Sequence, residues 1–254
     1  MMKYTTTGNG KPIVLIHGFG EDSKIWQLQV NVLQEIAQVI VPELPGTGRT
    51  AMEPVVTMES MADGIAEILD HEKITKAIII GHSMGGYITL AFAEKYPERL
   101  TAFGLVHSTA YADSEQKKAA RYKSMEFIRQ HGTSAFLEST TPNLFAAENR
   151  PVMDKTIRDL ALSVAYILPG ALISFLEAMI KRNDKTLILR ESRVPVLFIV
   201  GKADQAVPFS DTMQQVHLPE LSYIHILQQS GHMSMLEETE KCTKAILQFA
   251  EKAQ

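Results

Sequence analysis

Residues 76–98, KAIIIGHSMGGYITLAFAEKYPE, carry a serine between two glycines at the junction of two different hydrophobic patterns. The run Ile78–Ile80 is short, apolar and β-branched, which predicts a strand buried on both faces. From Tyr87 onward, apolar residues recur at helical spacing until Pro97, where a helix must end. The stretch therefore predicts a strand that turns abruptly into a helix, with Ser83 at the turn.

The glycines on either side of Ser83 fit such a turn. An abrupt strand-to-helix turn strains its central residue and brings strand and helix so close that only hydrogen fits two positions before and after it. Gly81 and Gly85 occupy those positions, so residues 81–85 match the pattern GxSxG. In that pattern the serine hydroxyl stands above the sheet and the next backbone amide faces a shared anion site. Ser83 is therefore a candidate nucleophile.

Strand and helix patterns alternate along most of the chain, which predicts an α/β fold with a mostly parallel sheet and helices on both faces. A hairpin is expected around residues 8–10. Residues from about 110 to 190 break the alternation with four helical segments, the first ending at Gly132. We expect a core domain of residues 1–109 and 191–254, with residues 110–190 inserted as a helical cap. Three apolar residues of the last cap helix are candidates to line a substrate pocket: Leu172, Phe175 and Met179.

Composition excludes several classes of function. The 254 residues are 45% apolar and 21% charged, which is typical of a globular protein. A net charge of −4 provides no bulk attraction to nucleic acid or to an anionic membrane, so we expect neither partner. The single cysteine, Cys242, cannot form an internal disulfide, and the first residues lack the apolar region of a signal peptide. We therefore expect a cytoplasmic protein, and the histidine spacings predict no metal site.

Residues 46–51 formally match the dinucleotide-binding pattern GxGxxA after a strand. That pattern requires a helix that begins at the glycines. Here Pro45 precedes the glycines and Pro54 follows them, with no helical periodicity between the two prolines. We therefore predict a loop at this position and no cofactor.

A serine nucleophile requires a neighbouring base and a group that orients the base, and two strand ends offer candidates. The strand at 196–200 leads into Asp204, and the strand at 223–227 leads into His232. Both residues follow the carboxyl ends of parallel strands, where open α/β sheets bind their ligands. Asp113 is the alternative acid, although together with Ser114 it also suits the N-cap of the first cap helix.

With these motifs the chain resembles the α/β-hydrolase family over nearly its whole length. The motifs that carry the resemblance are HGFG at 17–20, GxSxG at 81–85, GxxD at 201–204 and Gly-His at 231–232. The resemblance implies that Ser83 is the nucleophile, His232 the general base and then acid, and Asp204 the orienting carboxylate. It also implies an oxyanion hole made by the backbone amides of Phe19 and Met84.

The resemblance further implies acyl transfer through a covalent acyl-enzyme, with a small to medium, largely apolar carboxylic ester as the substrate. Lactones, thioesters and carbon–carbon bonds next to a ketone use the same residues and remain alternatives. A receptor-like protein that binds its ligand with little turnover is a further alternative, because fold does not determine function. A basic cluster fits either an acidic acyl carrier or a solvated helix face: Lys117, Lys118, Arg121 and Lys123.

Overall fold

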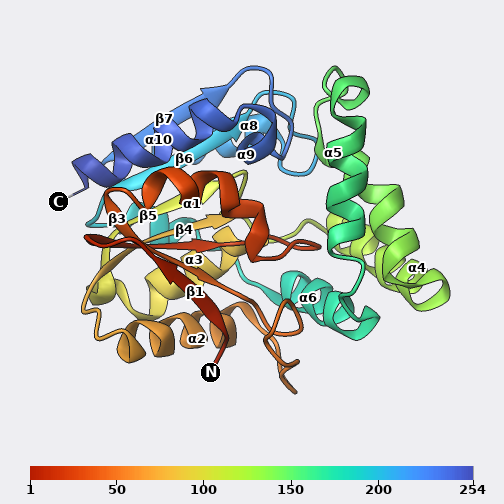
Figure 1. Ribbon diagram of the computed structural model, residues 1–254, viewed down its shortest axis with the longest axis horizontal. Helices are drawn as coiled ribbons and strands as arrows, with labels where there is room; N and C mark the ends of the chain where they lie inside the picture. Colours follow the sequence, from red (N-terminus) through yellow and green to blue (C-terminus); the bar gives the residue numbers. More distant parts are fainter. Residues whose placement is uncertain (254) are drawn as a thin grey trace.

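A seven-stranded sheet forms the centre of the computed structural model, which describes residues 1–253 (Figure 1). The strands are β1 (Tyr4–Thr7), β2 (Lys11–Ile16), β3 (Ala37–Pro42), β4 (Ala77–His82), β5 (Leu100–Val106), β6 (Val196–Gly201) and β7 (Ser222–Leu227). Their order in the sheet is β1-β3-β2-β4-β5-β6-β7, and every neighbouring pair is parallel except β1 with β3. The predicted mostly parallel sheet is therefore confirmed.

Helices cover both faces of the sheet. Helices α1 (Gln27–Leu33) and α10 (Thr239–Lys252) lie on one face, and α2 (Met58–His71) and α3 (Met84–Lys95) lie on the other (Figure 1). In β4, Ile78 and Ile80 pack into the core under α1 and α10, whereas Ile79 packs into the core under α2 and α3. Alternate side chains thus enter opposite cores, so β4 is buried on both faces as its isoleucine run predicts.

A group of helices lies between β5 and β6 and gathers beside one end of the sheet (Figure 1). It consists of α4 (Glu115–Thr140), the short 3₁₀ helix η3 (Thr141–Leu144), α5 (Arg150–Ser163) and α6 (Pro169–Lys181), whereas α7 (Thr186–Arg190) lies apart from them and contacts α3. Gly132 interrupts α4 with non-helical angles, φ 80° and ψ 176°, so the expected break at this glycine is confirmed. The chain also contains α8 (Phe209–Met213), α9 (Ser234–Glu237) and the 3₁₀ helices η1 (Ser23–Trp26) and η2 (Pro97–Arg99). Nowhere in residues 1–253 does a helix have both the length and the apolar character required to cross a membrane.

The hairpin expected around residues 8–10 is wrong. Strand β1 pairs antiparallel with β3, not with β2. Both edges of β2 are already occupied by parallel neighbours, β3 and β4, so no position beside it is left for β1. Gly8 and Gly10 do have positive φ, but they carry the chain past the backbone that joins α1 to β3.

Candidate active site

Ser83 occupies the turn between β4 and α3 in a backbone conformation that an L-residue rarely adopts, φ 52° and ψ −115°. A Cβ atom added to Gly81 would lie 2.1 Å from the backbone of Gly85, and one added to Gly85 would lie 2.4 Å from the oxygen of Ile16. Only glycine fits at either position, so the predicted close approach of strand and helix is confirmed. The backbone amide of Ser83 donates to the oxygen of Val106 at 2.9 Å, which holds the turn against β5.

Asp204 and His232 meet at the same end of the sheet. Asp204 follows β6 and His232 follows β7, and His232 Nδ1 lies 2.8 Å from Asp204 Oδ2. An ionised carboxylate only accepts hydrogen bonds, so Nδ1 carries the proton and Nε2 is left with a free lone pair. His232 and Ser83 line one cavity. Among residues 1–253, no hydrogen bond joins the side chains of Ser83 and His232. The distance between a catalytic hydroxyl and its base often exceeds hydrogen-bond length until a substrate binds.

The carboxylate of Asp204 is fixed from two sides. Its Oδ1 accepts the backbone amides of Ala206 and Val207 at 2.8 and 2.9 Å. Its Oδ2 accepts Nδ1 of His232 and also Nδ1 of His107, the latter at 3.0 Å. Burial alone would raise the pKa of Asp204, but the two histidines outweigh burial and hold this pKa well below its usual range. The side chain is therefore an ionised acceptor with a fixed orientation.

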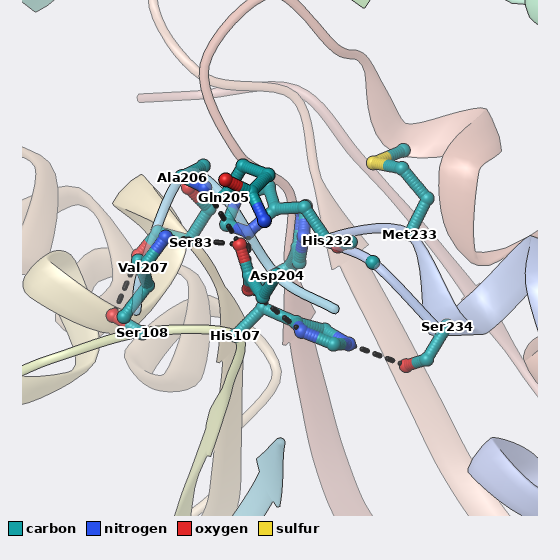
Figure 2. Close-up of polar contacts among 12 residues, drawn as sticks. Ser83, His107, Ser108, Asp204, Gln205, Ala206, Val207, His232, Met233 and Ser234 are labelled. Carbon is teal, nitrogen blue, oxygen red and sulfur yellow. Dashed lines mark hydrogen bonds and ion pairs between the residues drawn. The ribbon is translucent and has the colours of Figure 1, made fainter. Parts of the chain in front are cut away.

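His107 belongs to this site, although sequence analysis assigned it no role. It follows β5 with φ +50° and is fully buried. Figure 2 shows its imidazole between Asp204 and Ser234, and its Nε2 lies 2.7 Å from Ser234 Oγ. Nδ1 donates to the carboxylate, and in the neutral ring Nε2 accepts from the Ser234 hydroxyl. Burial lowers the pKa of His107 to about 4, which agrees with the neutral form.

A third imidazole, that of His82, lies beneath the site. Its Nδ1 is 3.0 Å from Glu21 Oε2 and its Nε2 is 2.9 Å from the backbone oxygen of His232. Both nitrogens face acceptors, so both carry protons and the ring is positively charged. Burial lowers the pKa of His82, but the Glu21 carboxylate, the backbone oxygen of His232 and the charge of Asp204 together outweigh burial and raise this pKa above the ordinary value. A buried ion pair therefore supports the backbone at His232.

Two backbone amides near Ser83 are free to bind an anion. Within residues 1–253, neither Phe19 N nor Met84 N donates a hydrogen bond. Met84 is the first residue of the 12-residue helix α3, so its amide lies at the positive end of the helix dipole. Phe19 lines the cavity, and a Cβ atom added to the preceding Gly18 would lie 3.2 Å from Ser83 Cβ. Both amides thus come from segments that meet at Ser83.

Comparison with known proteins identifies the family. Residues 11–119 match the family model of the alpha/beta hydrolase fold. A malate-bound structure of a thermophilic esterase from Thermogutta terrifontis is 30% identical with a TM-score of 0.94, covering 99% of this chain and 93% of that chain. The protein belongs to the α/β-hydrolase fold family.

Two curated relatives of this α/β-hydrolase are more distant. It is 25% identical to the pimeloyl-[acyl-carrier protein] methyl ester esterase of Vibrio cholerae, with 97% of both chains covered. It is 26% identical to the dihydrolipoyllysine-residue acetyltransferase component of the acetoin cleaving system of Pseudomonas putida, over 96% of this chain. The α/β-hydrolase spans only 64% of the length of that second relative.

The cavity of this α/β-hydrolase that contains Ser83 and His232 has a volume of about 340 Å³. Of the three residues expected to line a pocket, Met179 does so, whereas Leu172 and Phe175 are packed in the core. Leu176, from the same helix α6, lines the cavity with Met179. A larger hollow of about 760 Å³ lies elsewhere, beside Phe103 and α7, and contains none of the candidate catalytic residues.

In this α/β-hydrolase, Asp113 pairs with two arginines and not with His232. It is buried and forms ion pairs with Arg121 and Arg182. Ser114 is the N-cap of α4, where its side chain accepts the amide of Lys117 at 3.2 Å. The structure therefore brings Asp204, not Asp113, to the imidazole of His232.

The α/β-hydrolase also contains three potential metal ligands in this region. Ligand atoms of His107, Asp204 and His232 lie within 4.8 Å of one another. Both imidazoles direct Nδ1 at the same carboxylate oxygen, at hydrogen-bond distances of 3.0 and 2.8 Å. A cation would have to displace both N–H protons, so the geometry is that of a hydrogen-bonded group and not of a coordination site.

Proposed function

We propose that the protein is a serine hydrolase that cleaves a small to medium, largely apolar carboxylic ester through an acyl-enzyme intermediate. The observation that carries this proposal is the contact of 2.8 Å between His232 Nδ1 and Asp204 Oδ2, in a site where His232 shares a cavity with Ser83. The contact leaves His232 Nε2 free to take the proton of a serine hydroxyl.

In the proposed reaction, Ser83 Oγ attacks the ester carbonyl while His232 Nε2 takes the hydroxyl proton. The amides of Phe19 and Met84 bind the oxygen that becomes negative, and ionised Asp204 stabilises the imidazolium. The intermediate then collapses, and the alcohol leaves with the proton from His232. A water molecule repeats the sequence on the acyl-enzyme and releases the acid.

The cavity wall supports a substrate with an apolar body. Its apolar side chains come from the loop after β2, from α4, η3 and α6, and from the loop after β6: Phe19, Phe136, Leu137, Leu144, Leu176, Met179 and Val207. The proposal treats residues 110–190 as a cap over the core of residues 1–109 and 191–254, since α4 and α6 supply part of this wall. Lactones, thioesters and carbon–carbon bonds next to a ketone are alternative substrates for the same residues.

Labelling with a fluorophosphonate probe tests the proposal. The wild-type protein is expected to be labelled, Ser83→Ala to be unlabelled, and Ser134→Ala, at an exposed serine of α4, to be labelled like the wild type. A series of p-nitrophenyl esters of increasing acyl length, assayed beside simple lactones, then identifies the substrate class. Labelling that survives in Ser83→Ala would refute the assignment of the nucleophile. An unlabelled wild-type protein that binds esters tightly would support the receptor-like alternative.

A further inference from the structure

The cavity that contains Ser83 has a positively charged edge. Lys117 and Arg121 are four residues apart on α4, so they lie on the same side of the helix, and both line this cavity. We propose that these two residues form a subsite for a carboxylate, so that the substrate cleaved at Ser83 carries a second, anionic group. This inference rests on the proposed function and names the class of substrate: an ester with an apolar body and a free carboxylate.

The positive charge at this edge is not cancelled by the protein. Asp113 binds Nε of Arg121 and also lies 2.9 Å from Nη1 of Arg182, so one carboxylate is shared between two guanidinium groups. Lys117 Nζ donates to the backbone oxygen of Ala206 at 2.9 Å, which is a neutral partner. In the described chain no carboxylate forms an ion pair with Lys117. Lys117, Arg121 and Arg182 therefore carry three positive charges against the one negative charge of Asp113, and a bound substrate carboxylate would reduce this excess from two charges to one.

Tyr87 lies close to the same group of cations. It lines the cavity, and the guanidinium carbon of Arg182 lies 3.8 Å from the centre of its ring. Burial alone would raise the pKa of the Tyr87 phenol, yet the charges of Arg182, Lys117 and Arg121 outweigh burial and lower that pKa below its ordinary value. The cations therefore favour negative charge inside the cavity.

The two cations are held in place before any ligand binds. Asp113 orients Arg121, and the backbone of Ala206, two residues beyond Asp204, holds Lys117. A group that is ordered in advance loses little conformational entropy on binding. Ala206 belongs to the loop that carries Asp204, and both cations line the cavity of Ser83 and His232, so an anion bound by them would share that cavity with the proposed catalytic groups.

The remaining lysines of the basic cluster differ from these two residues. Lys118 pairs with Glu115 at 2.8 Å on the helix surface, and Lys123 is exposed. Neither of them lines the cavity. A solvated helix face therefore explains Lys118 and Lys123, but it does not explain why Lys117 and Arg121 face the same cavity as Ser83.

The kinetic test compares two esters of similar size, mono-p-nitrophenyl glutarate and p-nitrophenyl pentanoate. We expect the wild-type protein to favour the glutarate in kcat/KM, and Lys117→Gln to reduce the ratio of the two kcat/KM values about tenfold, the scale of one lost hydrogen bond between charged groups. Lys123→Gln removes the same charge from an exposed site on α4 and is expected to leave the ratio unchanged. An equal ratio in the wild type and Lys117→Gln would overturn the inference.

A binding test separates this inference from the proposed function. The Ser83→Ala protein is titrated with succinate by calorimetry, with and without Lys117→Gln, and we expect about tenfold weaker binding in the double variant. If no ester is hydrolysed but succinate binding depends on Lys117, the hydrolase proposal fails and the anion subsite stands. If esters are hydrolysed but succinate binding ignores Lys117, the subsite fails and the hydrolase stands. Tighter binding of inorganic phosphate than of succinate would overturn the choice of carboxylate.

Discussion

Replacing Asp204 with asparagine changes one oxygen to an amide nitrogen and leaves the shape of the side chain nearly unchanged. The backbone amides of Ala206 and Val207 donate to Oδ1, so the remaining oxygen must occupy that position. The new NH₂ group then takes the place of Oδ2 and faces Nδ1 of both His232 and His107. Donor would face donor at two contacts. Relief requires both imidazoles to move their proton to Nε2, and in His232 this is the nitrogen that accepts the serine proton in the proposed reaction.

The expected loss follows from this change of tautomer. In a serine protease, replacing the orienting aspartate of the triad with asparagine lowers kcat about 10⁴-fold, or roughly 5 kcal/mol of transition-state stabilisation. We expect a loss of the same order in Asp204→Asn, with the fold preserved because the two amide contacts to Oδ1 survive. The measurement is the rate of p-nitrophenol release under saturating ester, together with the melting temperature of each protein.

Asp113→Asn is the matched comparison, since it makes the same change at a buried aspartate whose partners are arginines. That variant is expected to lose stability rather than four orders of magnitude in kcat, because neither arginine takes part in proton transfer. If Asp204→Asn kept kcat within about tenfold of the wild type while Asp113→Asn lost it, the tautomer reasoning would be refuted and the acid would be Asp113.

Three further substitutions test the surroundings of the site. The pKa of His107 is about 6.5 in the unfolded chain and about 4 in the folded protein, so the unfolded state binds more protons between these two pH values. The free energy of unfolding therefore falls as pH drops from 6.5 to 4, by up to about 3 kcal/mol. His107→Asn removes this titrating group, yet it keeps a donor near Asp204 and tolerates φ +50°. The free energy of unfolding, measured by urea titration at pH 4.5 and at pH 6.5, should therefore differ less between the two pH values in the variant than in the wild type. An equal difference in both proteins would contradict the low pKa assigned to His107. Glu21→Gln leaves the charged ring of His82 without its ion-pair partner and should cost about 3 kcal/mol in urea unfolding, a value near zero being the contrary result. Ser83→Gly relieves the backbone strain at φ 52°, so it should be about 1 kcal/mol more stable to unfolding than Ser83→Ala and should melt at a higher temperature. Equal melting temperatures of the two variants would mean that the turn is not strained.

The elbow around Ser83 could be predicted from sequence because its constraints are local. Glycine is required at 81 and 85 because a Cβ atom at either position would collide with neighbouring backbone. Such a collision follows from any abrupt strand-to-helix turn. The positions of Asp204 and His232 were also predictable, since parallel strands direct their carboxyl ends to one edge of a sheet. Neither inference depends on how distant side chains pack.

The role of His107 depends on contacts that no local pattern encodes. Its two partners, Asp204 and Ser234, are 97 and 127 residues away in the chain. The three segments meet because β5, β6 and β7 are neighbours in the sheet, and strand order is a property of the whole fold. The only signal in the sequence is that His107 directly follows a predicted strand, which is equally true of residues with no function.

The same limit explains two other differences. Helical periodicity placed Leu172, Phe175 and Met179 on one apolar face of α6, but it does not say which part of that face meets the core and which meets the cavity. The glycines at 8 and 10 are typical turn residues, yet the partner of β1 is decided by which strand edge remains open in the sheet. In both cases competition between distant segments determined the outcome.

The three imidazoles near the site show how hydrogen-bond partners, rather than residue type, suit one histidine to the role of base that we propose. His82 faces two acceptors and is charged, whereas His107 faces one acceptor and one hydroxyl donor and is neutral. Only His232 has its Nδ1 proton held by a carboxylate and also lines the cavity of Ser83. A buried charged ring cannot accept a proton, and a ring whose Nε2 is already hydrogen-bonded is not available to the serine. Of the eight histidines in the chain, His232 is therefore the one whose surroundings suit the transfer of a proton from Ser83.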